Sequence, residues 1–138
     1  MDKEEIRLII RGQRKFLATG KTAAIKYRIT MLKKLRSLII EYEQEIIRAL
    51  WEDFHKPEFE VIATESRFVL KELNYTISKL RKWTRPRRVR TPIIHFLSHS
   101  YVKPQPYGQV LLMSPWNFPF QLAFLPLVGA LGAGNCVI

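Results

Sequence analysis

The sequence predicts an α/β fold in which long amino-terminal helices lead into the first strand–helix–strand part of a parallel sheet. Apolar residues recur at spacings of three and four up to Trp83, which is the helical period. An apolar run of strand length follows at residues 110–113, then a long apolar segment at 120–133 and a second apolar run at 136–138. Strand, loop, helix and strand is half of a doubly wound sheet, and such sheets bind ligands at the carboxyl ends of their strands.

The first two helices follow from their apolar stripes and their end signals. Acidic residues in the first turn predict a helix over Lys3–Ala18, with Gly20 as its stop. Thr22 is the predicted N-cap of a second, longer helix. This helix is expected to end before Pro57, since the residue before a proline is pushed out of helical geometry. Its predicted apolar stripe comprises Ile25, Leu32, Leu35, Ile39, Tyr42, Ile46 and Ala49.

A third helix is predicted from about Glu58 to Trp83, antiparallel to the second across a short connection. Its stripe comprises Ile62, Ser66, Val69, Leu73, Ile77 and Leu80. The polar, proline-bounded residues 98–105 suit an edge strand or an arm that reaches over another subunit.

Residues 81–90 form a basic connector with six basic side chains and Trp83. Positive charge and an aromatic ring are compatible with binding to nucleic acid. No known nucleic-acid-binding motif accompanies them, and a basic connector is more often held against acidic surface of its own protein. We therefore expect no nucleic-acid partner, and keep two alternative functions, a non-catalytic interaction fragment and a basic binder of nucleic acid or of a membrane surface.

The charge of the chain is uneven. Residues 1–72 carry 15 basic and 12 acidic side chains, whereas residues 73–138 carry 8 basic side chains and no acidic one. We expect the compensating carboxylates on a partner or on further chain. The single cysteine, Cys136, is typical of a reducing compartment, and the charged amino terminus lacks the apolar core of a signal peptide, so a cytoplasmic location is expected.

Residues 110–138 contain no charged side chain across 29 positions, which is longer than the roughly 20 residues that a spanning helix needs. Pro115, Pro119 and Pro126 divide this run into pieces of strand and short-helix size. A buried strand–helix–strand unit is therefore expected in place of a transmembrane helix.

Most of the usual catalytic signals are absent from the sequence. There is no glycine-rich phosphate loop of the GxGxxG or GxxxxGK type. The three histidines are not spaced as metal ligands relative to Cys136, so no metal site is expected. Cys136 itself begins an apolar strand with no nearby base, which favours a structural thiol over a nucleophile.

Asn117 is the strongest candidate for chemistry. Its carboxamide lies at the exit of the predicted strand between Pro115 and Pro119, where it could donate a hydrogen bond to a developing oxyanion. A turn asparagine that bonds its own backbone explains the residue type equally well. Trp116 could form the wall of a ligand site, although a place in the core is the more common one.

The motif PYGQVLLMSPWNFP at residues 106–119, together with ALGAGNCVI at 130–138, closely resembles the aldehyde dehydrogenase superfamily. Upstream residues such as Lys56, Glu65 and Trp83 resemble the class 3, fatty-aldehyde-dehydrogenase-like branch. The resemblance implies an aldehyde-dehydrogenase-type Rossmann-like cofactor domain that is incomplete here. It also implies an amino-terminal helical region with the basic connector at residues 1–92, and an arm with the first strand–loop–helix–strand unit at 93–138.

The activity that this resemblance implies is oxidation of an aldehyde to a carboxylic acid through a cysteine thioester, with NAD or NADP as cofactor. Asn117 corresponds to the family's oxyanion stabiliser, and Ser114, Pro115, Trp116 and Asn117 correspond to the loop beside the nicotinamide. The catalytic cysteine and glutamate have no counterpart in this chain, so the amino-terminal fragment alone is expected to be inactive. The resemblance also implies a homodimeric parent, and allows membrane association only of that parent.

Overall fold

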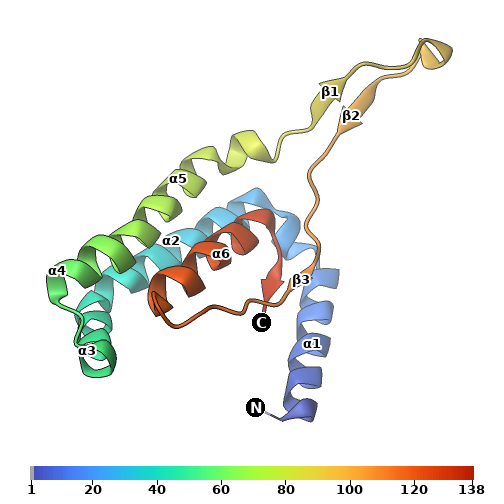
Figure 1. Cartoon of the computed structure of the whole chain (residues 1–138). Helices are drawn as coiled ribbons and strands as arrows, with labels where there is room; N and C mark the ends of the chain where they lie inside the picture. Colours follow the sequence, from blue (N-terminus) through green and yellow to red (C-terminus); the bar gives the residue numbers. More distant parts are fainter. Residues whose placement is uncertain (1) are drawn as a thin grey trace.

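The computed structural model describes residues 2–138 and consists mostly of helices with two short strand pairs (Figure 1). The predicted α/β order, helices first and a strand–helix–strand unit last, is confirmed. In chain order the elements are α1 (Lys3–Ala18), η1 (Lys21–Ala23), α2 (Ile25–Glu41), α3 (Glu43–Phe54), α4 (Glu58–Val61), η2 (Ile62–Ser66), α5 (Arg67–Trp83), β1 (Arg87–Val89), η3 (Ile93–His95), β2 (Ser100–Val102), β3 (Gln109–Val110), α6 (Pro119–Ala133) and β4 (Cys136–Val137).

Helix α1 has the predicted bounds because both of its ends carry clear signals. Asp2 accepts hydrogen bonds from the backbone of Glu4 and Glu5, and the Glu5 carboxylate bonds back to the Asp2 amide, which forms a capping box. Gly20 follows the helix in the left-handed region at φ 72°. Thr22 is not the N-cap of the next helix, because it lies buried in the 3₁₀ turn η1 and Ala24 takes the N-cap position.

The second predicted helix is two helices, α2 and α3, which meet at Tyr42. This residue leaves helical geometry, with φ −99° and ψ 16°, and its side chain is exposed. The break rotates the apolar stripe of α3, so that Ile47 and Leu50 are buried there, whereas the predicted Ala49 is exposed. The prediction of one unbroken helix was wrong because no glycine or proline marks the break.

The third predicted helix is present over its whole length as α4, η2 and α5, of which η2 is a π-helical turn. Its buried residues Val69, Leu73 and Leu80 pack with α2 and with Val128 of α6. Helices α2, α5 and α6 therefore enclose one hydrophobic core, and the chain segments on either side of the basic connector share it. None of the helices in the described part is both long enough and apolar enough to cross a membrane.

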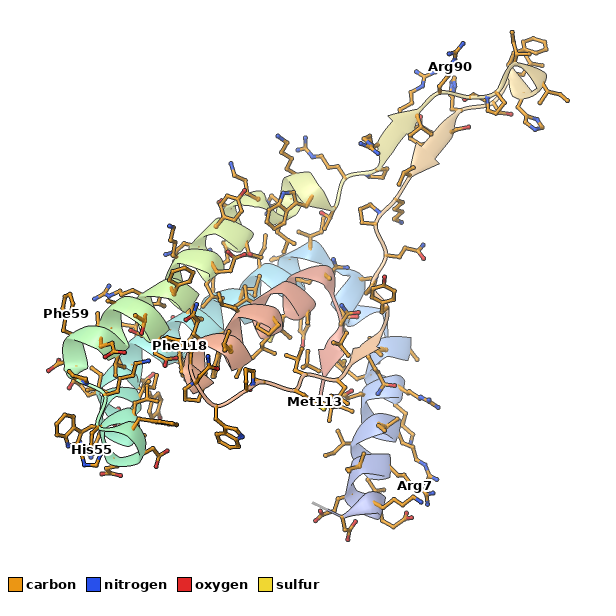
Figure 2. All side chains as sticks on the ribbon, viewed as in Figure 1. Arg7, His55, Phe59, Arg90, Met113 and Phe118 are labelled. Atoms are coloured by element: carbon orange, nitrogen blue, oxygen red, sulfur yellow. The ribbon has the colours of Figure 1, made fainter. Side chains whose placement is uncertain are left out.

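The basic connector forms part of a hairpin. Strand β1 pairs antiparallel with β2 in the register Arg87↔Val102, and the hairpin extends away from the helices (Figure 2). The expected edge strand within residues 98–105 is confirmed as β2. At the tip the large apolar side chains Ile93, Ile94, Phe96 and Leu97 are exposed. The boundary between residues 92 and 93 falls at this tip, and the division into two parts stays a prediction.

Strands β3 and β4 are parallel, with α6 as the connection between them. Gln109 is opposite Cys136 and Val110 is opposite Val137. The Leu112 amide also donates to the Ile138 carbonyl over 2.8 Å, which continues the ladder past the end of β3. The strand predicted at 110–113 thus begins one residue earlier, and Met113 is exposed beyond the pairing.

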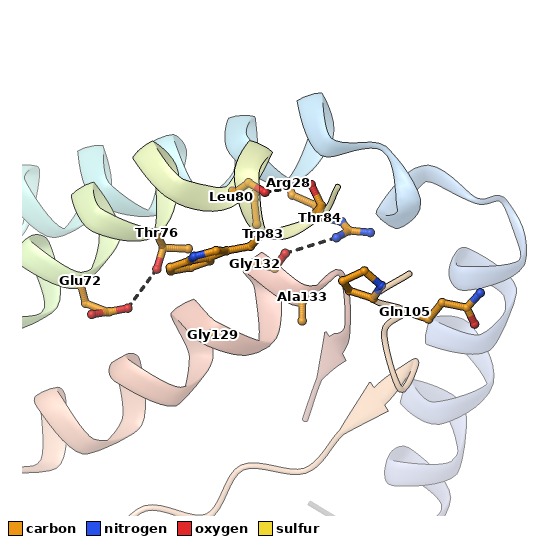
Figure 3. Close-up of a pocket in the computed structure, with 11 residues that line it drawn as sticks. Arg28, Glu72, Thr76, Leu80, Trp83, Thr84, Gln105, Gly129, Gly132 and Ala133 are labelled. Carbon is orange, nitrogen blue, oxygen red and sulfur yellow. Dashed lines mark hydrogen bonds between the residues drawn. The ribbon is translucent and has the colours of Figure 1, made fainter. Parts of the chain in front are cut away.

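The junction between α6 and β4 is closed by Gly134 and Asn135. Gly134 is in the left-handed region at φ 94°, and a Cβ there would lie 2.7 Å from the guanidinium carbon of Arg28. The buried Arg28 donates to the carbonyls of Thr22, Ala23 and Gly132, the last of these at the carboxyl end of α6 (Figure 3). The Asn135 carboxamide oxygen accepts from the Gly108 amide over 2.8 Å, which joins the end of α6 to the start of β3.

Candidate functional site

The predicted site residues lie in the loop between β3 and α6, at the carboxyl end of β3. Ser114, Pro115, Trp116 and Asn117 are all exposed, and Trp116 has an exposed fraction of 79%. A place in the core for Trp116 is therefore excluded in this structure. The loop lies where parallel sheets bind ligands, as the strand and helix pattern predicted.

The Asn117 carboxamide is free to bind another group. No hydrogen bond from or to its side chain is present among residues 2–138, so a turn that uses this amide is not observed. Asn117, Phe118 and Pro119 line a cavity of about 230 Å³. The other wall of the cavity comprises the end of α3, the connection to α4 and α4 itself, with Phe54, His55, Lys56, Pro57 and Glu60.

Two charged residues that sequence reasoning did not assign to the site hold the start of α6. The Glu65 side chain is fully buried, and its Oε1 accepts from the Lys56 ammonium over 2.7 Å. Its Oε2 accepts from the backbone amide of Gln121 over 2.7 Å, in the first turn of α6. The Lys56 Nζ also lies 4.2 Å from the centre of the ring of Phe118, the residue after Asn117.

This location of Glu65 has a physical explanation. The amino end of a helix has free amides and a partial positive charge, which favours a carboxylate there. Glu65 lies in the π-helical turn η2, and such turns often occur at functional sites. The only sequence signal was the resemblance that already included Lys56 and Glu65, since charged residues are expected on the surface.

Cys136 is half-buried, and burial raises the pKa of its thiol. A raised pKa lowers the fraction of thiolate, which is the nucleophilic form, and this agrees with the structural interpretation. In the part of the chain that the structure describes, no group of three or more His, Cys, Asp or Glu side chains is arranged to hold a metal ion.

A second cavity, of about 260 Å³, lies near the carboxyl end of α6 (Figure 3). Trp83, Glu72 and Thr76 of α5 face Gly129 and Gly132 of α6 across it. Glu72 accepts a hydrogen bond from Thr76 over 3.0 Å. None of the predicted site residues lines this cavity.

Comparison with known proteins identifies relatives of the whole chain. The model of the aldehyde dehydrogenase family matches residues 1–138. The chain is 43% identical over 123 residues to the 4,4'-diaponeurosporen-aldehyde dehydrogenase of Staphylococcus aureus (strain NCTC 8325 / PS 47). This alignment covers 89% of this chain and 27% of that protein. It is also 35% identical over 131 residues to aldehyde dehydrogenase family 3 member A2 of Pongo abelii. That alignment covers 95% of this chain and 27% of the relative.

The fold is also similar to that of a solved structure. A solved structure of Staphylococcus aureus AldH in a substrate-bound state aligns with a TM-score of 0.93 at 39% sequence identity. The alignment covers 99% of this chain and 30% of that structure's chain. The chain thus spans less than a third of the length of the relatives that it matches.

Proposed function

The chain belongs to the aldehyde dehydrogenase family, with class 3 members among its relatives, and on this premise we propose that it is the amino-terminal part of an enzyme that oxidises aldehydes to carboxylic acids with NAD or NADP. The observation that carries the proposal is the Asn117 carboxamide, which is exposed beyond the carboxyl end of a parallel strand and makes no side-chain hydrogen bond within the described residues 2–138. A neutral donor at this place suits a reaction in which a carbonyl oxygen gains negative charge.

The role of Asn117 follows from that chemistry. When a cysteine thiolate attacks the aldehyde carbon, a sulfur–carbon bond forms and the carbonyl π electrons move to the oxygen. The Asn117 side-chain N–H donates to this oxygen and does not titrate, so the stabilisation is available over a wide pH range. Both the thiolate and the glutamate that activates water for thioester hydrolysis are supplied by chain beyond residue 138 in this proposal.

The cofactor, when bound, supplies the acceptor for the hydride that leaves the aldehyde carbon. The residues of this chain fit the nicotinamide end of such a cofactor, because the loop with Ser114, Pro115 and Trp116 is exposed next to Asn117. They do not fit its pyrophosphate at the start of α6. The Gln121 amide there is already bonded to the Glu65 carboxylate, so it is not available to bind a phosphate. We therefore assign the pyrophosphate to other chain.

We also propose a cytoplasmic location and a homodimer for the complete enzyme. The single cysteine is compatible with a reducing compartment. The exposed apolar tip of the β1–β2 hairpin, with exposed fractions of 90% for Ile93 and 87% for Leu97, is a surface that a partner subunit would cover. Size-exclusion chromatography with light scattering on the complete enzyme tests the dimer, and a monomer at micromolar concentration would contradict it.

The activity is tested in a complete aldehyde dehydrogenase that carries residues 1–138, by following the formation of NADH or NADPH. Asn117→Ala is expected to lower kcat by about 10²–10³-fold, the usual effect of removing one oxyanion donor. Asn74→Ala is the matched control, since Asn74 is an exposed asparagine on α5 outside the site. The isolated 138-residue chain should show no turnover. Unchanged kcat in Asn117→Ala, or turnover by the isolated chain, would refute the proposal.

A further inference from the structure

We propose that Lys56 and Glu65 form a positioning pair that fixes the Asn117 carboxamide by holding the first turn of α6. This inference rests on the function proposed above for Asn117. It adds two residues of the α3–α5 region to the machinery, neither of which is expected to touch the aldehyde or to carry out chemistry.

Both residues are buried, with exposed fractions of 8% for Lys56 and 0% for Glu65. Each oxygen of the Glu65 carboxylate has one partner at 2.7 Å, the Lys56 ammonium on one side and the Gln121 amide on the other. The carboxylate therefore links the connection after α3 to the first turn of α6. Lys56 has a second, longer contact of 3.8 Å with the half-exposed Glu60.

Lys56 and Glu65 contact the chain at two residues that follow Asn117. The centre of the ring of Phe118, the residue after Asn117, lies 4.2 Å from the Lys56 Nζ. Gln121, four residues after Asn117, is held by the carboxylate. Pro119 between them has a fixed φ and needs no amide partner, so the segment from Phe118 to Gln121 has little freedom to move.

Stability alone is a weak reason for such a pair. A buried ion pair must overcome the loss of hydration of both charges, and well-packed apolar side chains are often as stable. What a carboxylate supplies here, and an apolar side chain does not, is a directed contact with one particular amide of α6. A site amide displaced by about 1 Å can lose about 100-fold in rate, so a directed contact matters for catalysis.

The test is a set of variants in the complete enzyme that carries residues 1–138. Glu65→Gln keeps an acceptor for the Gln121 amide and removes the charge that holds Lys56. Lys56→Met removes both the cation and its contact with Phe118. We expect each variant to lower kcat by about 10- to 100-fold and to change KM for the aldehyde by less than about threefold.

The decisive measurement repeats both substitutions in the Asn117→Ala background. Once the amide is gone there is nothing left to position, so each substitution should cost less than about twofold in kcat. A merely structural pair would cost the same factor in both backgrounds. Val69→Ala, a truncation of a fully buried residue of α5, is the control. It should lower the urea midpoint without changing kcat.

The outcomes separate the two proposals. If Asn117→Ala lowers kcat but the pair variants have no effect, or have equal effects in both backgrounds, the positioning role is refuted and the proposed function stands. If Asn117→Ala leaves kcat unchanged, the proposed function fails first. Should Glu65→Gln not fold, Lys56→Met provides the same comparison from the other member of the pair.

Discussion

The contact between Gly134 and Arg28 leads to a prediction about the stability of the chain. Gly134→Ala would place a Cβ atom 2.7 Å from the guanidinium carbon and from Nε of Arg28, at a backbone φ of 94°. Left-handed geometry costs a residue with a side chain about 1–3 kcal/mol. Displacing the guanidinium weakens charged hydrogen bonds that are each worth about 1.5–3 kcal/mol. We expect a loss of about 3–5 kcal/mol in the free energy of unfolding.

The measurement is urea unfolding of the 138-residue chain, followed by circular dichroism. Gly129→Ala is the matched control, because it changes a glycine within α6 to the same residue at a place where no atom outside the helix's own backbone and its chain neighbours lies within 4 Å of the new Cβ. This control should gain about 0.5–1 kcal/mol, the helix propensity of alanine over glycine. A loss below about 1 kcal/mol in Gly134→Ala, or equal effects of the two substitutions, would refute the reasoning.

Three further predictions concern other parts of the chain. Asn135→Ala removes the acceptor of the Gly108 amide and should cost about 1–3 kcal/mol in urea unfolding; a loss below about 0.5 kcal/mol would contradict it. Because burial raises the pKa of the Cys136 thiol, less thiolate is present at mildly alkaline pH, and iodoacetamide should label the folded chain more slowly than the urea-unfolded chain; equal labelling rates would argue against this burial. The basic hairpin should cause no mobility shift of duplex DNA at about 0.15 M salt; a shift that disappears in the Arg87→Ala, Arg88→Ala double variant would favour nucleic-acid binding.

The elements with complete end signals were predicted well from the sequence. Helix α1 has its predicted bounds because its cap, its acidic first turn and Gly20 all mark the same ends. Helix α6 begins one residue before the prediction, at Pro119, and ends at Ala133 as predicted, with Gly134 in the left-handed geometry of a C-cap. The break at Tyr42 was missed because no glycine or proline marks it in the sequence.

The site was predictable only in part. The strand exit at Asn117 could be located because prolines and an apolar run mark it. The Lys56–Glu65 ion pair could not be located from the sequence. Sequence patterns assign charged residues to the surface, whereas Glu65 is fully buried. Its burial depends on the amino end of α6, which is 56 residues away from Glu65 in the chain and offers the Gln121 amide.

The attachment of α1 has a consequence for synthesis of the protein. Gln13 donates to the Val137 carbonyl over 2.8 Å, and Gln109 donates to the Ile10 carbonyl over 3.1 Å, so the first helix is tied to the last strand pair. Gln13 and Val137 are 124 residues apart. At about 5–20 residues per second, the ribosome needs roughly 6–25 s to deliver the second partner after the first. Through that interval Gln13 on α1 lacks its hydrogen-bond partner on β4.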